Sequence, residues 1–329
     1  MTVGATNVRK PCVCEMGDVV DLEGVYVPIV SGFNADESVN ESAYANVIDY
    51  NLRAGVRGIV VAGTTGEYYA LSVAERKAQF ELARDVLAAR AHPVSGRAHL
   101  IAGCNAGGTR DCIDYAQQAN RLGFDAVMLA APPTSLPNQR ELAAHVRAVA
   151  VEGGLPVILY NYPARAGVEF GFEALDELAT MPEVIAIKES SGDFSRFLTM
   201  QRRYQGALTI MCGSDDQIYD YMAWGVRSWL AGTANVLPAQ HVAIVNSMNR
   251  GDHELGRRQY AALLPWVQHM EAGSYNQKVK AGLKHLGHDC GTVRRPLLPM
   301  SERQVGELIQ LLNQARADFA AVTNPSTSS

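Results

Sequence analysis

The chain of 329 residues is long enough for one large domain or two modest ones, and its composition of 47% apolar and 19% charged residues is typical of a folded globular protein. The formal net charge is only −5 and the 29 lysines and arginines are scattered, which argues against a nucleic-acid-binding or membrane-surface protein. No apolar stretch approaches the roughly 20 residues of a membrane span. The N-terminus lacks the apolar core of a signal peptide, so we expect a soluble, cytoplasmic protein.

Eight short runs of β-branched and other apolar residues recur along the chain and predict strands. Most of them are continuously apolar, as expected for parallel strands that are covered on both faces. The predicted strands are Val25–Val30, Gly58–Ala62, Leu100–Gly103, Ala126–Ala130, Val157–Tyr160, Val184–Lys188, Leu208–Cys212 and Ser228–Ala231.

Amphipathic stretches with helical periodicity separate these strands. Ser72 and Glu75 have the spacing of a capping box, which marks the start of a helix. The predicted helices are Ser42–Ala54, Ser72–Arg90, Thr109–Leu122, Gln139–Val151 and Phe172–Ala179, with two more that begin near Phe194 and near Asp215.

Eight alternations of strand and helix predict an α/β fold, a closed (β/α)8 TIM barrel. The alternative is an open doubly wound sheet. Such a sheet normally carries a glycine-rich dinucleotide fingerprint after its first strand, and Val30–Asn34 does not match one.

The residues after the eighth strand predict a helical C-terminal extension of the barrel. Its expected helices are Pro238–Asn249, Asp252–Met270, Asn276–Leu286 and Ser301–Thr323. We therefore expect a flexible N-terminal extension at 1–20, the barrel at 21–236, C-terminal helices packed on it at 237–322, and a flexible tail at 323–329.

Lys188 ends an apolar predicted strand, whereas the other five lysines lie in polar or helical contexts. In a (β/α)8 barrel the active site lies at the C-terminal ends of the strands. A lysine there is partly desolvated, which lowers its pKa from about 10.4 and leaves a neutral amine that can attack a carbonyl. The alternative is a lysine that pairs with a carboxylate, such as Glu189 or Asp215.

Three further segments follow predicted strand ends. Tyr160 either donates and accepts a proton or packs its ring into the barrel mouth. Thr64 and Thr65 lie between two glycines, in a turn that can bind a carboxylate or be a plain turn. Arg165 either grips a second carboxylate as a bidentate fork or is a solvated surface arginine.

No metal-binding pattern is apparent, since the eight histidines include no H-x-x-x-H or H-x-H pair. We therefore expect neither a metal nor a cofactor. The six cysteines match neither a disulfide framework nor a C-x-x-C pair, and we interpret Cys12 and Cys14 as incidental thiols.

Five motifs in order give the chain a family resemblance. They are Gly63–Glu67, Tyr160–Pro163, Lys188–Gly192, Gly213–Asp215 and Arg295–Leu297. With them the chain, from about residue 22 to about residue 300, resembles the dihydrodipicolinate synthase / N-acetylneuraminate lyase family of class I, Schiff-base-forming aldolases. The resemblance implies a lyase on a TIM barrel that acts on pyruvate or a related 2-oxo acid, and a homotetramer built as a dimer of dimers.

The resemblance also implies a role for each candidate residue. Lys188 would be the Schiff-base lysine and Tyr160 the proton donor and acceptor at the substrate carbonyl. Thr65, with Thr64, would bind the substrate carboxylate, and Thr64 would relay protons to the tyrosine. The other substrate-binding residues would be Gly213 and Leu230, through backbone groups, and Arg165, through its guanidinium on a second substrate.

One position departs from the family pattern. The synthases and the neuraminate lyases carry a tyrosine pair after the fourth strand, and one of these tyrosines completes a proton relay in the partner subunit. Thr134 stands at that place here, and its hydroxyl is shorter and less acidic.

Three functions follow as hypotheses. The first is a condensation of pyruvate with aspartate semialdehyde, of the 4-hydroxy-tetrahydrodipicolinate synthase type, which Arg165 supports. The second is a retro-aldolase or dehydratase acting on a 2-keto-3-deoxy sugar acid or a hydroxy-2-oxo acid, which Thr134 supports. The third is a non-catalytic homologue, against which the intact lysine, tyrosine and threonines argue.

Overall fold

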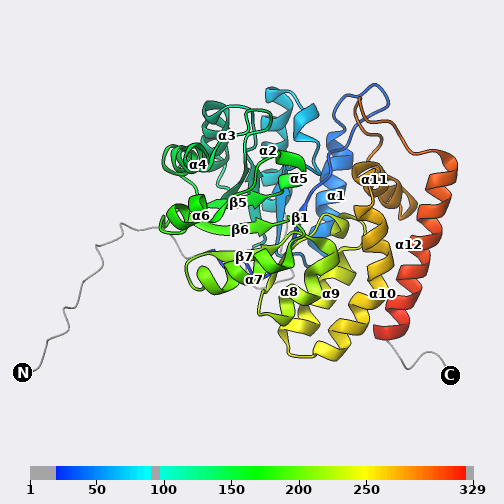
Figure 1. The fold of residues 1–329 in the computed structure, drawn as a ribbon. Helices are drawn as coiled ribbons and strands as arrows, with labels where there is room; N and C mark the ends of the chain where they lie inside the picture. The colour runs from blue at the N-terminus through cyan, green and yellow to red at the C-terminus, as the bar shows by residue number, and fades with distance from the viewer. Residues whose placement is uncertain (1–19, 90–96, 324–329) are drawn as a thin grey trace, which may run out of the picture.

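The computed structural model describes residues 20–89 and 97–323 of the chain (Figure 1). The flexible segments expected at 1–20 and 323–329 fall almost entirely on residues 1–19 and 324–329, which lie outside this description. Cys12, Cys14 and the expected helix end at Arg90 lie outside it as well.

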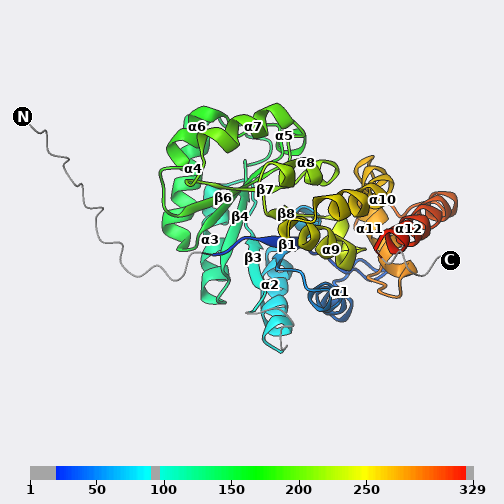
Figure 2. The same ribbon diagram turned by 90° about the horizontal axis from the view of Figure 1, so that it is seen from below.

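Eight parallel strands pair in chain order, and the eighth pairs with the first, so the sheet closes into a barrel. The predicted (β/α)8 barrel is therefore confirmed. Figure 2 views the strands with the helices arranged around them. The strands are β1 (Gly24–Pro28), β2 (Gly58–Val61), β3 (His99–Gly103), β4 (Ala126–Ala130), β5 (Val157–Asn161), β6 (Val184–Glu189), β7 (Thr209–Cys212) and β8 (Ser228–Leu230).

The strands are apolar on both faces because each face packs against a different core. Successive side chains of a strand point to opposite faces, so one set fills the barrel and the other meets the helices. Val60, Ile158 and Met211 belong to the cluster inside the barrel, which also contains Tyr160. The outward-facing set packs with the helices in one continuous core.

Local capping signals fix where several helices begin. The capping box predicted at Ser72 and Glu75 is present, and Asn138 and Glu141 form a second one. The helices that alternate with the strands are α1 (Glu41–Arg53), α2 (Val73–Ala88), α3 (Thr109–Arg121), α4 (Gln139–Gly153), α6 (Phe172–Leu178), α7 (Phe194–Arg203), α8 (Ile218–Ala223) and α9 (Pro238–Asn249).

α9 packs against β1 and so completes the eighth strand–helix unit of the barrel. Three helices follow it, α10 (His253–Glu271), α11 (Tyr275–His285) and α12 (Glu302–Thr323). α10 packs on α9, and α12 packs on both α10 and α11, which forms the layer at one side of the barrel in Figures 1 and 2. This layer brings the α10–α11 connection to the C-terminal ends of β7 and β8.

Candidate active site

A cavity of about 100 Å³ lies at the C-terminal ends of the barrel strands. Six of the seven residues predicted for the site line this cavity. A second cavity, of about 220 Å³, adjoins it and is also lined by Thr64, Tyr160 and Arg165. The six residues are Thr64, Thr65, Tyr160, Arg165, Lys188 and Gly213. Residues that are more than 140 positions apart in the sequence thus meet where a TIM barrel places its catalytic groups.

Lys188 lies near the end of β6, where it pairs in register with Tyr160 of β5 and Met211 of β7. Its side chain is only 6% exposed, and its Nζ lies 4.3 Å from the centroid of the Tyr160 ring. Burial lowers the pKa of this amine to about 8, although the negative charges of Asp215 and Glu271 act in the opposite direction. A substantial fraction of the amine is therefore neutral near physiological pH.

The two carboxylates considered as partners of Lys188 are engaged elsewhere. Glu189 points to the other face of the strand, where it pairs with Arg196 at 3.2 Å and accepts hydrogen bonds from the Asn161 amide. The hypothesis that Glu189 neutralises Lys188 is therefore wrong. Asp215 influences the lysine through its charge without a direct ion pair.

Hydrogen-bond donors from three elements hold the Asp215 carboxylate. The Trp229 indole N–H donates to Oδ1 at 2.8 Å. The Thr233 and Tyr275 hydroxyls lie 2.8 Å and 3.1 Å from Oδ2. These contacts fix Asp215 on the cavity wall, with its charge close to the lysine.

Tyr160 is 6% exposed, and its ring packs 5.9 Å from that of Tyr162, centroid to centroid. Burial raises the pKa of the Tyr160 phenol far above its ordinary value, so the group is neutral and keeps its proton at pH 7. The Tyr160 ring packs in the cluster inside the barrel and also lines the cavity beside the lysine, so proton transfer by this tyrosine stays a prediction.

The turn that carries Thr64 and Thr65 follows β2 and lies half-buried at the cavity. The backbone N–H of Glu67 donates to the Thr64 carbonyl at 3.1 Å and closes the turn. Gly66 lies in a tight part of this turn, because a Cβ at this position would lie only 3.0 Å from the Ile29 carbonyl oxygen. Both threonines of this closed turn line the cavity.

Gly213 follows β7 and lies directly against the lysine side chain. A Cβ at this position would lie 2.6 Å from Lys188 Cε and 2.1 Å from Ser190 Oγ. Leu230, in contrast, is fully buried in the cluster inside the barrel and does not line the cavity. The residue of that segment that lines the cavity is Gly232, two positions beyond the end of β8 (Ser228–Leu230).

Arg165 lies on α5 (Pro163–Ala166), a one-turn helix that the sequence analysis did not predict. Its guanidinium carbon lies 5.7 Å from the centroid of the Tyr162 ring, at the boundary between the two cavities. Thr134 is exposed and has a φ of 75°, and it lines neither cavity.

Sequence reasoning did not single out the residues that the C-terminal helices contribute. Glu271 ends α10, and Tyr275 and Asn276 begin α11. All three line the cavity with Lys188, as does Ser190 just beyond β6. The motif after β6 could have drawn attention to Ser190, but no strand-end pattern marks Glu271, Tyr275 or Asn276.

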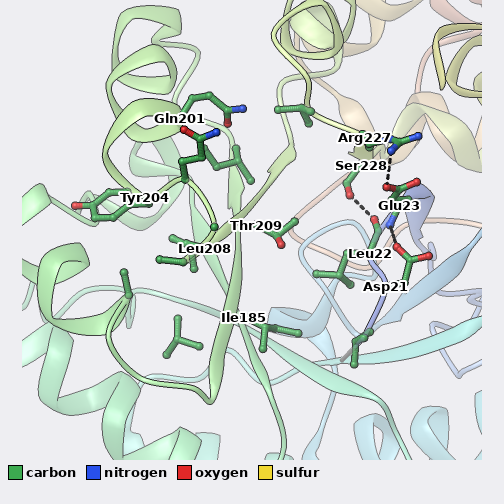
Figure 3. Close-up of a pocket in the computed structure, with 18 of the residues that line it drawn as sticks. Asp21, Leu22, Glu23, Ile185, Gln201, Tyr204, Leu208, Thr209, Arg227 and Ser228 are labelled. Carbon is green, nitrogen blue, oxygen red and sulfur yellow. Dashed lines mark hydrogen bonds and ion pairs between the residues drawn. The ribbon is translucent and has the colours of Figure 1, made fainter. Parts of the chain in front are cut away.

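A larger cavity of about 730 Å³ lies at the opposite end of the barrel (Figure 3). The starts of β6, β7 and β8 line it, and an ion pair of 3.0 Å between Arg227 and Glu23 lies at its edge. It lies at the N-terminal face of the strands, where residues of TIM barrels serve stability more than catalysis. The smaller cavity around Lys188 is therefore the candidate active site.

The part of the chain that the structure describes holds neither a metal-binding cluster nor a membrane-spanning helix. Within 20–89 and 97–323, no group of three or more histidine, cysteine, aspartate or glutamate side chains is arranged to hold a metal ion. Over the same ranges, no helix combines the length and the apolar character that crossing a bilayer requires.

Comparison with known sequences gives consistent matches along the chain. The model of the protein family described as "Dihydrodipicolinate synthetase family" matches residues 21–315. A 4-hydroxy-tetrahydrodipicolinate synthase of Exiguobacterium sp. strain AT1b is 34% identical over 291 residues, which cover 88% of this chain and 97% of the relative. The enzyme of the same name from Stenotrophomonas maltophilia strain K279a is 32% identical over 284 residues, which cover 86% and 92%.

Solved structures give the same picture. A dihydrodipicolinate synthase of Acinetobacter baumannii, solved in complex with pyruvate, superposes with a TM-score of 0.84 at 27% identity and covers 90% of this chain and 99% of that one. The 4-hydroxy-tetrahydrodipicolinate synthase of Methylacidiphilum fumariolicum SolV has the same fold, with a TM-score of 0.86 at 24% identity and coverage of 92% and 99%.

Proposed function

The chain belongs to the dihydrodipicolinate synthetase family, and on this premise we propose that it is a lyase that forms a Schiff base between Lys188 and pyruvate or a related 2-oxo acid. The observation that carries the proposal is the buried amine of Lys188, 4.3 Å from the Tyr160 ring and with a pKa lowered to about 8. A neutral amine in the lining of a small cavity is what nucleophilic attack on a ketone requires.

The geometry of the site supports the following first half of the reaction. The Thr64–Thr65 turn binds the carboxylate of the 2-oxo acid and directs its ketone toward Lys188. The amine adds to carbon 2, and the carbonyl oxygen leaves as water after accepting protons, for which Tyr160 is the neighbouring donor. Loss of a proton from carbon 3 then converts the imine into a nucleophilic enamine.

For the second half we propose condensation of the enamine with aspartate semialdehyde, as in a 4-hydroxy-tetrahydrodipicolinate synthase. Relatives that align over most of the chain carry this name. We propose that Arg165 binds the carboxylate of the aldehyde as a bidentate fork, which its position in the lining of both cavities supports.

A second candidate uses the same lysine and tyrosine as a retro-aldolase or dehydratase of a 2-keto-3-deoxy sugar acid or a hydroxy-2-oxo acid. The specific observation in its favour is Thr134, which is exposed, lines neither cavity and carries no phenol. A screen that follows pyruvate release or water loss from such acids, alongside consumption of aspartate semialdehyde, separates the two candidates.

We further propose that the protein is a cytoplasmic homotetramer, a dimer of dimers. Two large apolar side chains near the second cavity support an interface there, since Tyr69 is 50% exposed and Leu136 is 59% exposed. Sedimentation equilibrium of the full chain tests this assembly, and a monomer at micromolar concentration would contradict it.

Trapping with borohydride tests the Schiff base directly. Incubation with pyruvate and sodium borohydride is expected to convert the imine into a stable amine on the peptide that contains Lys188, as mapped by mass spectrometry. Lys188→Ala is expected to lose both the label and turnover while remaining folded. Lys284→Ala, which removes a lysine that is 71% exposed, is the matched control and should keep both. A wild-type chain that takes no label at Lys188 would support the non-catalytic homologue instead.

A further inference from the structure

Two buried polar residues that the proposed mechanism does not use lie directly behind the candidate catalytic pair. Tyr160 pairs in register with Lys188, and one position further along the same strands Asn161 pairs with Glu189. Successive side chains of a strand point to opposite faces, so Asn161 and Glu189 lie on the outer face of the barrel, away from the cavity. Both are fully buried there.

The side-chain amide of Asn161 makes contacts in two directions. Its nitrogen donates to both carboxylate oxygens of Glu189, at 3.0 Å each. Its oxygen accepts a hydrogen bond from the backbone N–H of Phe170 at 3.0 Å, nine positions further along the chain. The orientation of the amide is fixed, because a carboxylate only accepts and a backbone N–H only donates. The second contact closes the base of the loop that runs from Tyr162 to Glu169.

This loop carries two residues of the candidate active site. The one-turn helix α5 lies within it and bears Arg165. Tyr162 and Arg165 both line the two cavities, and the guanidinium carbon of Arg165 lies 5.7 Å from the centroid of the Tyr162 ring. The place of this guanidinium relative to Lys188 therefore depends on how the base of the loop is held.

Arg196, near the start of α7, holds the same base from the other side. Its side chain is 5% exposed, and its Nε donates to the Glu189 carboxylate at 3.2 Å. Its Nη1 donates to Glu169 Oε1 at 3.0 Å, and its Nη2 donates to the Phe170 carbonyl oxygen. The backbone N–H of Ser191 donates to Glu189 Oε1 at 2.8 Å. Buried polar networks with this many contacts rigidify the segments that they join.

Resting on the proposed function, we propose that Asn161 is a positioning residue for the second substrate. It ties the loop that carries Arg165 to the strand that carries Lys188, and so sets the separation between the guanidinium and the Schiff base. An aldehyde that is bound by its carboxylate at Arg165 must reach the enamine on Lys188, so this separation selects the length of the aldehyde that reacts. A looser base lowers the affinity for the aldehyde.

The first half of the reaction does not depend on the Asn161 side chain in the same way. Backbone hydrogen bonds hold the ends of β5 and β6 together, as in the bond of 2.9 Å from the Ser190 N–H to the Asn161 carbonyl oxygen. These bonds persist when the side chain is removed, so Tyr160 and Lys188 stay in register. Capture of pyruvate by the lysine should therefore continue.

The test compares variants that remove, disturb and rebuild the Asn161 contacts. Asn161→Ala removes both contacts, and Asn161→Asp places a second carboxylate beside Glu189. The double variant Asn161→Asp, Glu189→Gln exchanges the two groups, so that the amide at 189 donates to the carboxylate at 161. Asn51→Ala is the matched control, because Asn51 is a fully buried asparagine on α1, away from the loop, and its amide donates to the Val47 carbonyl oxygen at 2.9 Å.

Three measurements follow the variants: the KM for aspartate semialdehyde, borohydride labelling of Lys188 with pyruvate, and hydrogen–deuterium exchange of the Phe170 amide. We expect Asn161→Ala to raise this KM and to speed this exchange by at least about 10-fold, with labelling within about threefold of the wild type. Asn161→Asp should raise the KM as well, and the double variant should recover it to within about threefold of the wild type. Asn51→Ala should leave all three within about twofold.

An unchanged KM and an unchanged Phe170 exchange in Asn161→Ala would overturn the positioning role, as would an equal loss of labelling and of aldehyde affinity. If Asn161→Ala does not fold, the double variant decides, because a KM as high as that of Asn161→Asp would also overturn the role. A wild-type chain that takes no label, or takes it and does not consume the aldehyde, would instead overturn the proposed function. The exchange of the Phe170 amide still reports on the loop in that case, so the two failures are distinct.

Discussion

The Nζ atom of Lys280 lies 2.8 Å from Oε1 of Glu67, and both side chains are almost fully buried. The pair joins α11, in the C-terminal extension, to the turn after β2 that presents Thr64 and Thr65. The backbone N–H of Arg294 donates to the other oxygen of Glu67 at 3.2 Å. The C-terminal helices therefore do more than cover the barrel, because they hold in place the turn that we propose binds the substrate carboxylate.

Removal of this amine should weaken both the fold and substrate binding. Lys280→Met leaves the buried Glu67 carboxylate without its cation, and breaking a buried pair in this way costs about 3–5 kcal/mol. We expect the free energy of unfolding in urea to fall by this amount and the KM for pyruvate to rise, because the turn loses its support.

Lys284→Met provides the control on the same helix. This lysine is 71% exposed and pairs with Asp289 at the surface, so we expect a change within about 1 kcal/mol. If the two variants lose similar stability, the buried pair does not anchor the turn.

Lys188 should make the protein less stable in the neutral range. Its pKa is about 8 in the folded chain and near 10.5 in the unfolded chain, so protonated Lys188 disfavours folding by about 3 kcal/mol below pH 8. Between pH 8 and 10.5 the unfolded chain binds the additional proton, and the stability contributed by this site therefore rises with pH. Lys188→Met should thus be more stable than the wild type at pH 7, and the difference should shrink toward pH 10.5.

Urea unfolding of the two chains at several pH values measures this difference. Its pH dependence separates the effect of the charge from any packing change, because packing of the methionine side chain does not titrate. A difference that stays constant from pH 7 to pH 10.5 would mean that Lys188 has an ordinary pKa.

Gly213 should be essential for the position of the Lys188 side chain, because the glycine leaves room for it. In Gly213→Ala the new Cβ would lie 2.6 Å from Lys188 Cε, so the amine must move. Because a displacement of about 1 Å at a reacting group can cost about 100-fold in rate, we expect a loss of that size in borohydride labelling by pyruvate.

Gly306→Ala is the control, since nothing lies within 4 Å of a Cβ at this position of α12. An alanine there should leave labelling unchanged and stabilise the helix by about 0.5–1 kcal/mol. Normal labelling in Gly213→Ala would show that the lysine tolerates the added methyl group.

The sequence alone determined the barrel, because eight apolar runs separated by amphipathic helices have few stable arrangements. It also placed Lys188 and Tyr160 together. Both end apolar strands that are consecutive in the chain, and parallel neighbours bring such ends to one face. Strand boundaries differ from the prediction by a residue or two, as at β1 and β7, since hydrogen bonding rather than hydrophobicity sets where a strand stops.

Lys188 is less exceptional in its burial than the sequence suggested. Lys278 and Lys280 lie in predicted helices, yet they are 7% and 4% exposed, about as buried as Lys188 at 6%. Only tertiary contacts separate the three. Lys280 pairs with Glu67, and Lys278 donates to the His269 carbonyl, whereas Lys188 faces the cavity without an ion pair.

Tertiary structure alone decided the wall of the site that holds Glu271, Tyr275 and Asn276. The turn between α10 and α11 reaches the cavity because α10 packs on α9 and on α12, and this packing depends on contacts between residues distant in sequence. Hydrophobic periodicity predicts which face of a helix is buried, but not which barrel strand its last residue will lie above.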